Sequence, residues 1–185
     1  PQILSVQEKA EKEADRAGEI IQRMRQRVEK KAPERQMLDV TELVTSCLEM
    51  AQLGNGEMQT LLSSSIEPGV PPLQADPVQI RQILINLLRN AREAVADQDE
   101  KRVKLSVTQN GDMLEFRVTD NGPGVPDELV DNLFRAFTGA KHKGVGVGLA
   151  ISRSIAQNHG GDLRLETLSD ESGASFLLTL PVHPR

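Results

Sequence analysis

The chain has 185 residues, a formal net charge of −5 and one cysteine. This length allows one ordinary domain with a hydrophobic core and one attached element, but not two full domains. The acidic balance and the scattered basic residues argue against a nucleic-acid-binding surface. No signal peptide is recognisable, and no apolar run approaches the roughly 20 residues of a membrane helix. We therefore expect a cytoplasmic chain that contacts neither nucleic acid nor membrane.

The first segment has the pattern of a bundle helix. Between residues 3 and 28, small or apolar side chains recur at alternating steps of four and three: Ala10, Ala14, Ala17, Ile21, Met24 and Val28. A solvated single helix is one interpretation of this heptad seam, and a helix that buries its narrow stripe against partner helices is the other. Pro33 ends the segment, because proline disfavours helical geometry in the residue before it. We place a domain boundary after residue 35.

Residues 36–185 alternate between helical and strand patterns. Helices are predicted over residues 39–53, 76–97 and 148–158, and strands over 58–66, 73–75, 102–109, 113–119, 162–167 and 175–180. Asn110-Gly111 predicts a hairpin between two of these strands. Cys47 lies on an apolar helix face, which favours a core residue over a reactive thiol. This order of elements predicts an α+β fold, a two-layer sandwich with helices on one face of a mixed sheet.

The helix over 76–97 carries two stripes. Asp76 and Pro77 are an N-cap followed by proline at the first helical position. One face is apolar: Ile80, Ile83, Leu84, Leu87, Leu88, Ala91 and Val95. The polar stripe beside it holds Gln79, Gln82, Asn86, Asn90 and Glu93. It is either a solvated face or, because asparagine is a poor helix former, a row of carboxamide oxygens held out for a cation such as magnesium.

Two glycine-rich stretches follow this helix. Asp120 ends a strand and precedes Gly122 and Gly124, which is either a plain turn or a carboxylate that accepts a hydrogen bond from an adenine amine. Lys141 precedes the run 144–149, which opens a helix. Backbone amides at a helix N-terminus suit phosphate, although such a run can also be a flexible loop. The run is neither a P-loop nor a dinucleotide-binding fingerprint.

In order and spacing these segments resemble the ATP-binding domain of sensor histidine kinases. Residues 86–94 match its N box, 120–124 its first glycine box, Phe134 and Phe137 its F box, and 144–149 its second glycine box. Its Bergerat fold is shared with gyrase, heat-shock chaperone and mismatch-repair ATPases. The first segment is similar to the second helix of the dimerisation bundle in kinases of the oxygen-sensing and nitrogen-regulatory type. The resemblance thus implies one long bundle helix over 1–35 and a catalytic ATP-binding domain over 36–185.

The resemblance implies a role for each matched residue. Asn90 would be the main magnesium ligand, Asn86 would support the phosphates of ATP, and Glu93 would lie near the metal. Asp120 would recognise adenine, and residues 126–147 would form a mobile lid. The nucleotide site would comprise Asn86, Asn90, Asp120, Gly122, Gly124, Phe134, Lys141, Gly144, Gly146, Gly148 and Leu149. The chain departs from the family at residues 138–140, which puts hydroxyl contacts to phosphate from that stretch in doubt.

The kind of phosphoryl transfer is indicated by Asn86. Gyrase-like ATPases carry a glutamate here that activates water, whereas an asparagine leaves the γ-phosphate for another nucleophile. The resemblance therefore implies a histidine kinase, with magnesium and ATP as cofactors. A serine kinase of the anti-sigma-factor type and a degenerate binding module are the alternatives.

Partners follow from the same resemblance. None of His142, His159 and His183 lies on the bundle segment, so we expect a fragment without its acceptor histidine. The expected partners are the phosphoacceptor bundle of the same kinase, a second copy in a full-length homodimer, and the receiver domain of a response regulator.

Overall fold

The computed structural model describes residues 33–52, 60–135, 147–166 and 173–183. It divides the chain into two units, Pro1–Ala32 and Pro33–Arg185, and every described residue belongs to the second. Most of the predicted bundle helix over 1–35 thus lies outside the described residues. That helix and the domain boundary at residue 35 stay predictions.

A five-stranded mixed sheet forms one layer of this unit. Its strand order is β2-β4-β5-β7-β6. β2 runs parallel to β4, and the other neighbours are antiparallel. The bounds are Leu61–Ile66 for β2, Arg102–Asn110 for β4, Met113–Asp120 for β5, Asp162–Glu166 for β6 and Ser175–Pro181 for β7. The β4–β5 hairpin lies at one end of this sheet, and Asp120 lies at the other.

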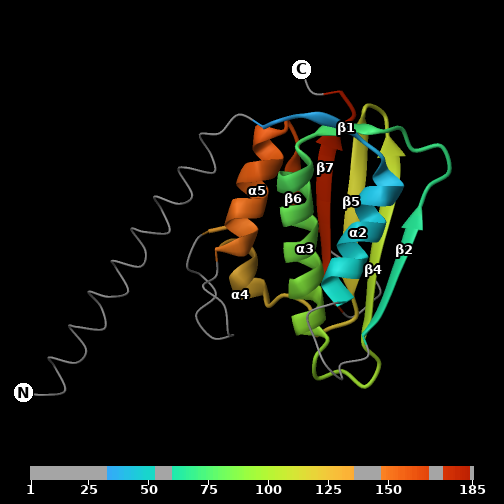
Figure 1. The fold of residues 1–185 in the computed structure, drawn as a ribbon. Coiled ribbons are helices and arrows are strands. Elements are labelled where there is room, and N and C mark those ends of the chain that lie inside the picture. Colours follow the sequence, from blue (N-terminus) through green and yellow to red (C-terminus); the bar gives the residue numbers. More distant parts are fainter. Residues whose placement is uncertain (1–32, 53–59, 136–146, 167–172, 184–185) are drawn as a thin grey trace, which may run out of the picture. The chain divides into compact units, whose positions relative to one another are not determined.

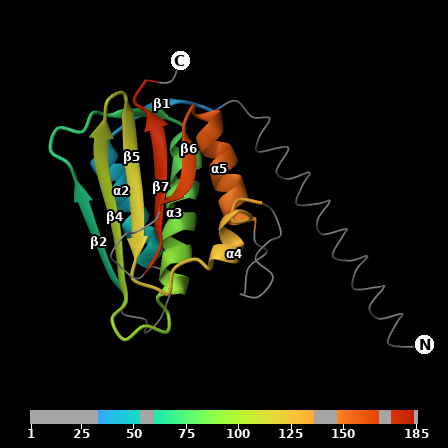
Figure 2. The same ribbon diagram turned by 180° about the vertical axis from the view of Figure 1, so that it is seen from behind.

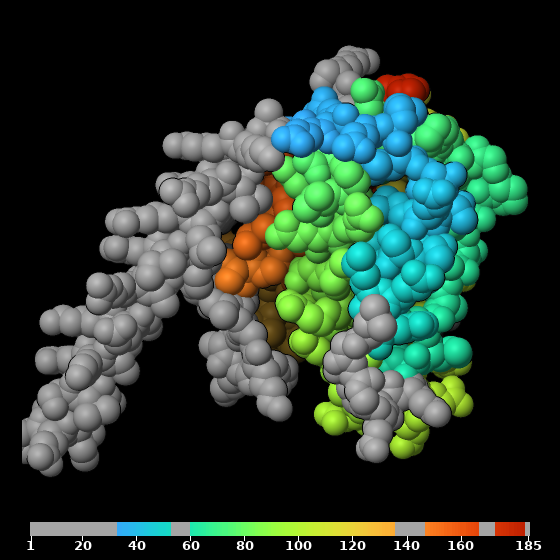
Figure 3. All heavy atoms as spheres, viewed as in Figure 1, coloured from blue at the N-terminus to red at the C-terminus, as the bar shows by residue number. Residues whose placement is uncertain are grey.

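Three helices form the second layer. Figures 1 and 2 show α2 (Val40–Gln52), α3 (Pro77–Ala94) and α5 (Gly148–Asn158) on the same face of the sheet. In the space-filling view, α3 lies between the orange α5 and the cyan α2 (Figure 3). The two-layer α+β sandwich predicted from the sequence is therefore confirmed.

The central helix α3 begins and packs as its sequence predicts. Asp76 is its N-cap, and its Oδ1 accepts hydrogen bonds from the backbone N–H groups of Val78 and Gln79 at 3.0 and 3.2 Å. All seven apolar residues of the predicted stripe, Ile80 to Val95, are buried against the sheet and the neighbouring helices. Cys47 of α2 is buried as well, and burial raises the pKa of its thiol to about 11, as expected for an unreactive core residue.

Three local features differ from the sequence prediction. Residues 36–38, for which no element was predicted, form a short strand β1 (Gln36–Leu38), which pairs antiparallel with β3 (Leu73–Ala75). The predicted lid begins with a one-turn helix α4 (Asp127–Val130). The hairpin turn consists of Gly111 and Asp112 rather than Asn110 and Gly111, because the ladder continues to the pair of Asn110 and Met113.

A buried histidine ties the end of α5 to the start of α3. His159 is 2% exposed. Its Nε2 accepts a hydrogen bond from the backbone N–H of Asp76 at 3.2 Å, and its Nδ1 lies 2.9 Å from the carbonyl oxygen of Ile155. A neutral ring with its proton on Nδ1 satisfies both contacts. Burial lowers the pKa of His159; Arg35 also lowers it, whereas the Ile155 carbonyl and Asp76 raise it.

This lowered pKa predicts a pH dependence of stability. The unfolded chain binds a proton at His159 near the usual pKa of 6.5, whereas the folded chain resists it. The contribution of His159 to the free energy of unfolding should therefore be highest above pH 6.5 and should decline as the pH falls below that value. Urea denaturation between pH 8 and 5 checks this. The decline should be smaller in His159→Gln than in the parent and in the matched control His183→Gln, and equal slopes in all three would contradict it.

Candidate functional site

The two N-box asparagines lie one turn apart on α3, in different surroundings. The Asn86 carboxamide is held at both ends: its Nδ2 donates to Ser152 Oγ at 3.2 Å, and its Oδ1 accepts from Arg89 Nη2 at 3.3 Å. Asn90 is half-buried, and among the described residues none forms a hydrogen bond with its side chain. The Asn90 oxygen is thus available to a ligand.

Glu93 continues the polar stripe. Its carboxylate lies 3.8 Å from Arg89, and the two side chains are 70% and 68% exposed. An exposed pair of this kind contributes little to stability, so neither group is fixed in place. Glu93 can approach a metal near Asn90, but nothing in the described structure directs it there.

The carboxylate of Asp120 has one oxygen bound and one unbound. Asp120 ends β5 and is only 4% exposed. Its Oδ1 accepts from the backbone N–H groups of Gly122 and Ala174 at 2.9 and 3.3 Å. Burial raises the pKa of Asp120, and these two amides oppose that shift. No described residue bonds to Oδ2, which can therefore accept a hydrogen bond from the amine of a base.

The Asp120 loop packs against the C-terminal end of α3. A Cβ added at Gly122 would lie 2.9 Å from the carbonyl oxygen of Ala94, so only glycine fits without a shift. Gly124 follows with a φ of 80°. The contact places the Asp120 loop beside the last turn of the helix that carries Asn86 and Asn90.

The start of α5 meets the same helix at Asn86. A Cβ added at Gly148 would lie 2.5 Å from Asn86 Oδ1, so a side chain there would displace the asparagine. Val147, the N-cap of α5, makes no side-chain cap bond, and the first amides of the helix are left for another partner. Leu149 follows in the first turn and is half-buried.

These contacts arrange the site along α3. Asn86, Asn90 and Ala94 are spaced by four residues and share one face of the helix. The α5 N-terminus lies at the first position and the Asp120 loop at the last, about 12 Å apart by helical rise. Asn90 lies between them. A nucleotide whose base reaches Asp120 would thus extend its phosphates toward Asn90 and Gly148.

The F box and the second glycine box are described only in part. Phe134 is half-buried, and the Arg153 guanidinium lies 4.9 Å from the centre of its ring. Arg153 also donates from Nε and Nη2 to Asp162 at 2.9 and 3.2 Å, which fixes it against the start of β6. The remaining residues of the predicted lid site, Phe137, Lys141, Gly144 and Gly146, lie outside the described residues.

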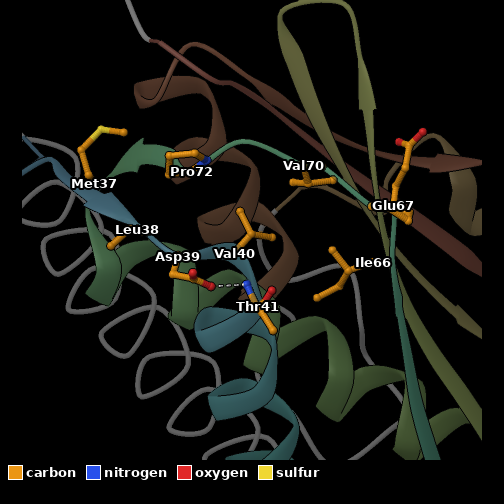
Figure 4. A pocket seen from close by; sticks show the side chains of 11 residues that line it. Met37, Leu38, Asp39, Val40, Thr41, Ile66, Glu67, Val70 and Pro72 are labelled. Atoms are coloured by element: carbon orange, nitrogen blue, oxygen red, sulfur yellow. Dashed lines mark hydrogen bonds between the residues drawn. The ribbon is translucent and has the colours of Figure 1, made fainter.

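Two hollows differ in their relation to this site. A groove of about 450 Å³ between α3 and α5 is lined by Gln82, Ile85, Asn86, Arg89, Gly148, Ile151 and Ser152. A second hollow of about 460 Å³ lies between the start of α2 and the β2–β3 connection. Figure 4 shows Val40, Ile66 and Val70 around it, with Asp39 bonded to the backbone N–H of Thr41 at 2.8 Å. The second hollow is at the hairpin end of the sheet, away from Asp120, and we assign it no role.

The described residues also limit other kinds of site. Among them, no three His, Cys, Asp or Glu residues are grouped so that they could hold a metal ion. No described helix is both long and apolar enough to cross a membrane.

Sequence reasoning missed several contacts of the site. Ser152 follows the second glycine box and looked like an ordinary helix residue. The amide of Ala174 carries no signal, since every residue except proline has one. Arg153, whose guanidinium lies over the F-box ring, was equally invisible. The one sign that could have found Ser152 is its polar side chain on the buried face of the predicted helix over 148–158.

Comparison with known proteins shows which class of domain has this fold. Residues 75–184 match the family described as "Histidine kinase-, DNA gyrase B-, and HSP90-like ATPase". That match covers more than half of the chain, and the chain belongs to this family as an ATP-binding domain of the histidine-kinase type.

Particular relatives agree with this. The sensor protein FixL of Bradyrhizobium diazoefficiens is 38% identical over 182 residues, which are 98% of this chain and 36% of that protein. The C4-dicarboxylate transport sensor protein DctS of Rhodobacter capsulatus is 37% identical, over 95% of this chain and 27% of its own length. This chain thus spans only a minor part of either relative.

Solved structures match the fold. The catalytic domain of histidine kinase ThkA superposes with a TM-score of 0.73 at 28% identity, and the match covers 82% of this chain and 97% of that one. Full-length ShkA, solved in complex with AMPPNP, gives a TM-score of 0.73 at 25% identity, over 87% of this chain and 34% of that one.

Proposed function

We propose that this chain binds Mg-ATP and transfers the γ-phosphoryl group to a histidine on a phosphoacceptor bundle, from which it passes to an aspartate of a response regulator. The observation that carries the proposal is Asn86. In relatives that hydrolyse ATP, a glutamate at this position activates water. Here the carboxamide, held by Ser152 and Arg89, cannot take a proton from water. A neutral imidazole needs no such base, because its ring nitrogen is already nucleophilic.

Each half of the site has its own task in this proposal. Asp120 Oδ2 accepts the hydrogen bond of the adenine amine, while Gly122 lets the loop lie close to α3. The first amides of α5, including that of Gly148, contact the phosphates, and Asn86 supports them. Lys141 and the amides of Gly144 and Gly146 add to the phosphate contacts, and Phe134 lies within the lid.

Magnesium fits the residues that are present. The ion takes oxygen ligands and keeps several waters, and it is commonly held by one or two protein groups together with substrate phosphates. The unbound carboxamide of Asn90 offers one such oxygen, and Glu93 is near enough to approach. The bound ion would neutralise charge on the phosphates during transfer.

In this proposal none of the three histidines of the chain is the phosphoacceptor. His159 is buried, and both ring nitrogens have partners, so it cannot receive a phosphoryl group without local unfolding. His183 lies at the hairpin end of the sheet, away from Asp120, where the backbone N–H of Val182 donates to Asp112. His142 lies outside the described residues. Residues 1–32 hold no histidine, so we place the acceptor on another helix of the bundle.

The setting of the whole protein belongs to the same proposal. A homodimer would supply the complete bundle, a receiver domain would take the phosphoryl group, and the reaction would occur in the cytoplasm. Nucleic acid and membrane would have no part in this segment's work.

Incubation with γ-labelled ATP and magnesium tests the proposal. The chain alone should remain unlabelled, whereas a separately supplied bundle fragment with an acceptor histidine should acquire acid-labile label. Transfer should be slow, because the two pieces no longer hold each other in reacting geometry. A bundle fragment with the acceptor replaced by glutamine is the control. Acid-labile label on the chain alone would contradict the separate acceptor, and His142→Gln and His183→Gln would then locate it.

A further inference from the structure

The carboxamide of Asn86 has a defined orientation. Its two ends face Arg89 and Ser152 at 3.3 and 3.2 Å. A guanidinium group only donates hydrogen bonds, so the atom that faces Arg89 must be the oxygen. The nitrogen therefore faces Ser152, whose Oγ accepts. The orientation rests on chemistry rather than on an arbitrary choice of amide flip.

The two partners of Asn86 differ in how firmly they are held. Arg89 is 68% exposed and is shared with the equally exposed Glu93. Ser152 is 1% exposed and lies one turn after Gly148 on the buried side of α5. Of the α5 residues that line the groove with Asn86, Ser152 alone has a polar side chain. Ser152 therefore stays where the helix packing places it, whereas the position of Arg89 depends on its contacts with Asn86 and Glu93.

We propose that Ser152 is a positioning residue for nucleotide binding: its hydroxyl holds Asn86 Nδ2 against α5 and so leaves Asn86 Oδ1 to hold the Arg89 guanidinium in the groove that Gly148 also lines. The inference rests on the proposed function, in which Asn86 supports the phosphates. Without the Ser152 acceptor, the carboxamide is free to rotate, and its nitrogen can then face the Arg89 guanidinium, donor against donor, so that this cation is no longer held beside the phosphates.

Ser152→Ala should weaken Mg-ATP binding by about 5-fold, the equivalent of one ordinary hydrogen bond of about 1 kcal/mol. The affinity for adenosine should not change, because adenosine reaches Asp120 but has no phosphates near Asn86. This contrast separates positioning of Asn86 from general damage to the fold, which would weaken both ligands. Ser152→Cys, with a similar volume and only a weak acceptor, should follow the alanine variant. It supplies the same comparison if that variant does not fold.

A double-mutant cycle with Asn86→Ala decides whether Ser152 acts through Asn86. Isothermal calorimetry on the parent, both single variants and the double variant should give no further loss from Ser152→Ala once Asn86 is alanine. An equal loss in both backgrounds, an equal loss for adenosine, or full Mg-ATP affinity in both Ser152 variants would overturn the inference. These outcomes leave the proposed function intact, whereas failure of the parent to bind Mg-ATP would refute that function and the inference with it.

Discussion

Replacing Asn90 with alanine should reduce magnesium-dependent ATP binding by at least about 100-fold, since even residues behind a metal's direct ligands contribute 10- to 100-fold. The Asn90 side chain is the one N-box carboxamide without a hydrogen-bonding partner among the described residues. If it holds the ion between the helix and the phosphates, alanine removes the protein's main ligand. Calorimetric titration with ATP, with and without magnesium, measures the effect.

Asn110→Ala is the matched control for this variant. Asn110 is an exposed asparagine in the hairpin at the far end of the sheet, where its Nδ2 donates to Glu115 at 2.9 Å. Its replacement should leave nucleotide binding unchanged. If Asn90→Ala binds Mg-ATP as tightly as Asn110→Ala and the parent do, then Asn90 is not the magnesium ligand.

Replacing Asp120 with alanine should weaken ADP binding by about 10- to 100-fold, because a hydrogen bond to a charged group contributes roughly 1.5–3 kcal/mol. The parent should also discriminate against GDP, since guanine presents a carbonyl where adenine presents an amine. Equal affinity of the parent for ADP and GDP would remove Asp120 from base recognition.

Asp120→Asn is the sharper variant. The carboxamide oxygen can keep the two backbone bonds that Oδ1 now accepts from Gly122 and Ala174, so the loop should stay in place. Its nitrogen would then stand where Oδ2 stands and would face the adenine amine, donor against donor. The affinity of this variant for ADP should fall, and its affinity for GDP should rise relative to its affinity for ADP. Unchanged preference for ADP in this variant would contradict the assignment.

Capping residues and hydrophobic periodicity were sufficient to predict individual helices and strands. α3 was predictable because Asp76, Pro77 and a continuous apolar stripe specify its start and its buried face. The hairpin was predicted one residue out of register, because a glycine was recognised but the ladder that extends to Asn110 depends on cross-strand pairing. β1 was missed, since a strand of three residues has no periodicity and pairs with a segment far along the chain.

The site depended more on contacts between distant residues. The asparagines and Asp120 could be named from motif spacing, but the groups that orient them could not. Ser152 meets Asn86 across 66 positions of sequence, and Ala174 meets Asp120 across 54. Such contacts arise when α5 packs on α3 and when β7 pairs with β5. No spacing rule within one segment encodes them.

The fate of the γ-phosphoryl group tests the central claim most directly. The chain is saturated with γ-labelled ATP and magnesium, with and without a bundle fragment that carries an acceptor histidine. Label on the fragment and label released as inorganic phosphate are counted over time. Because Asn86 provides no base for water, acid-labile label on the fragment should exceed released phosphate, and the chain without the fragment should release almost none. Rapid release of phosphate at the same rate with and without the fragment would show an ATPase instead, and would contradict the account.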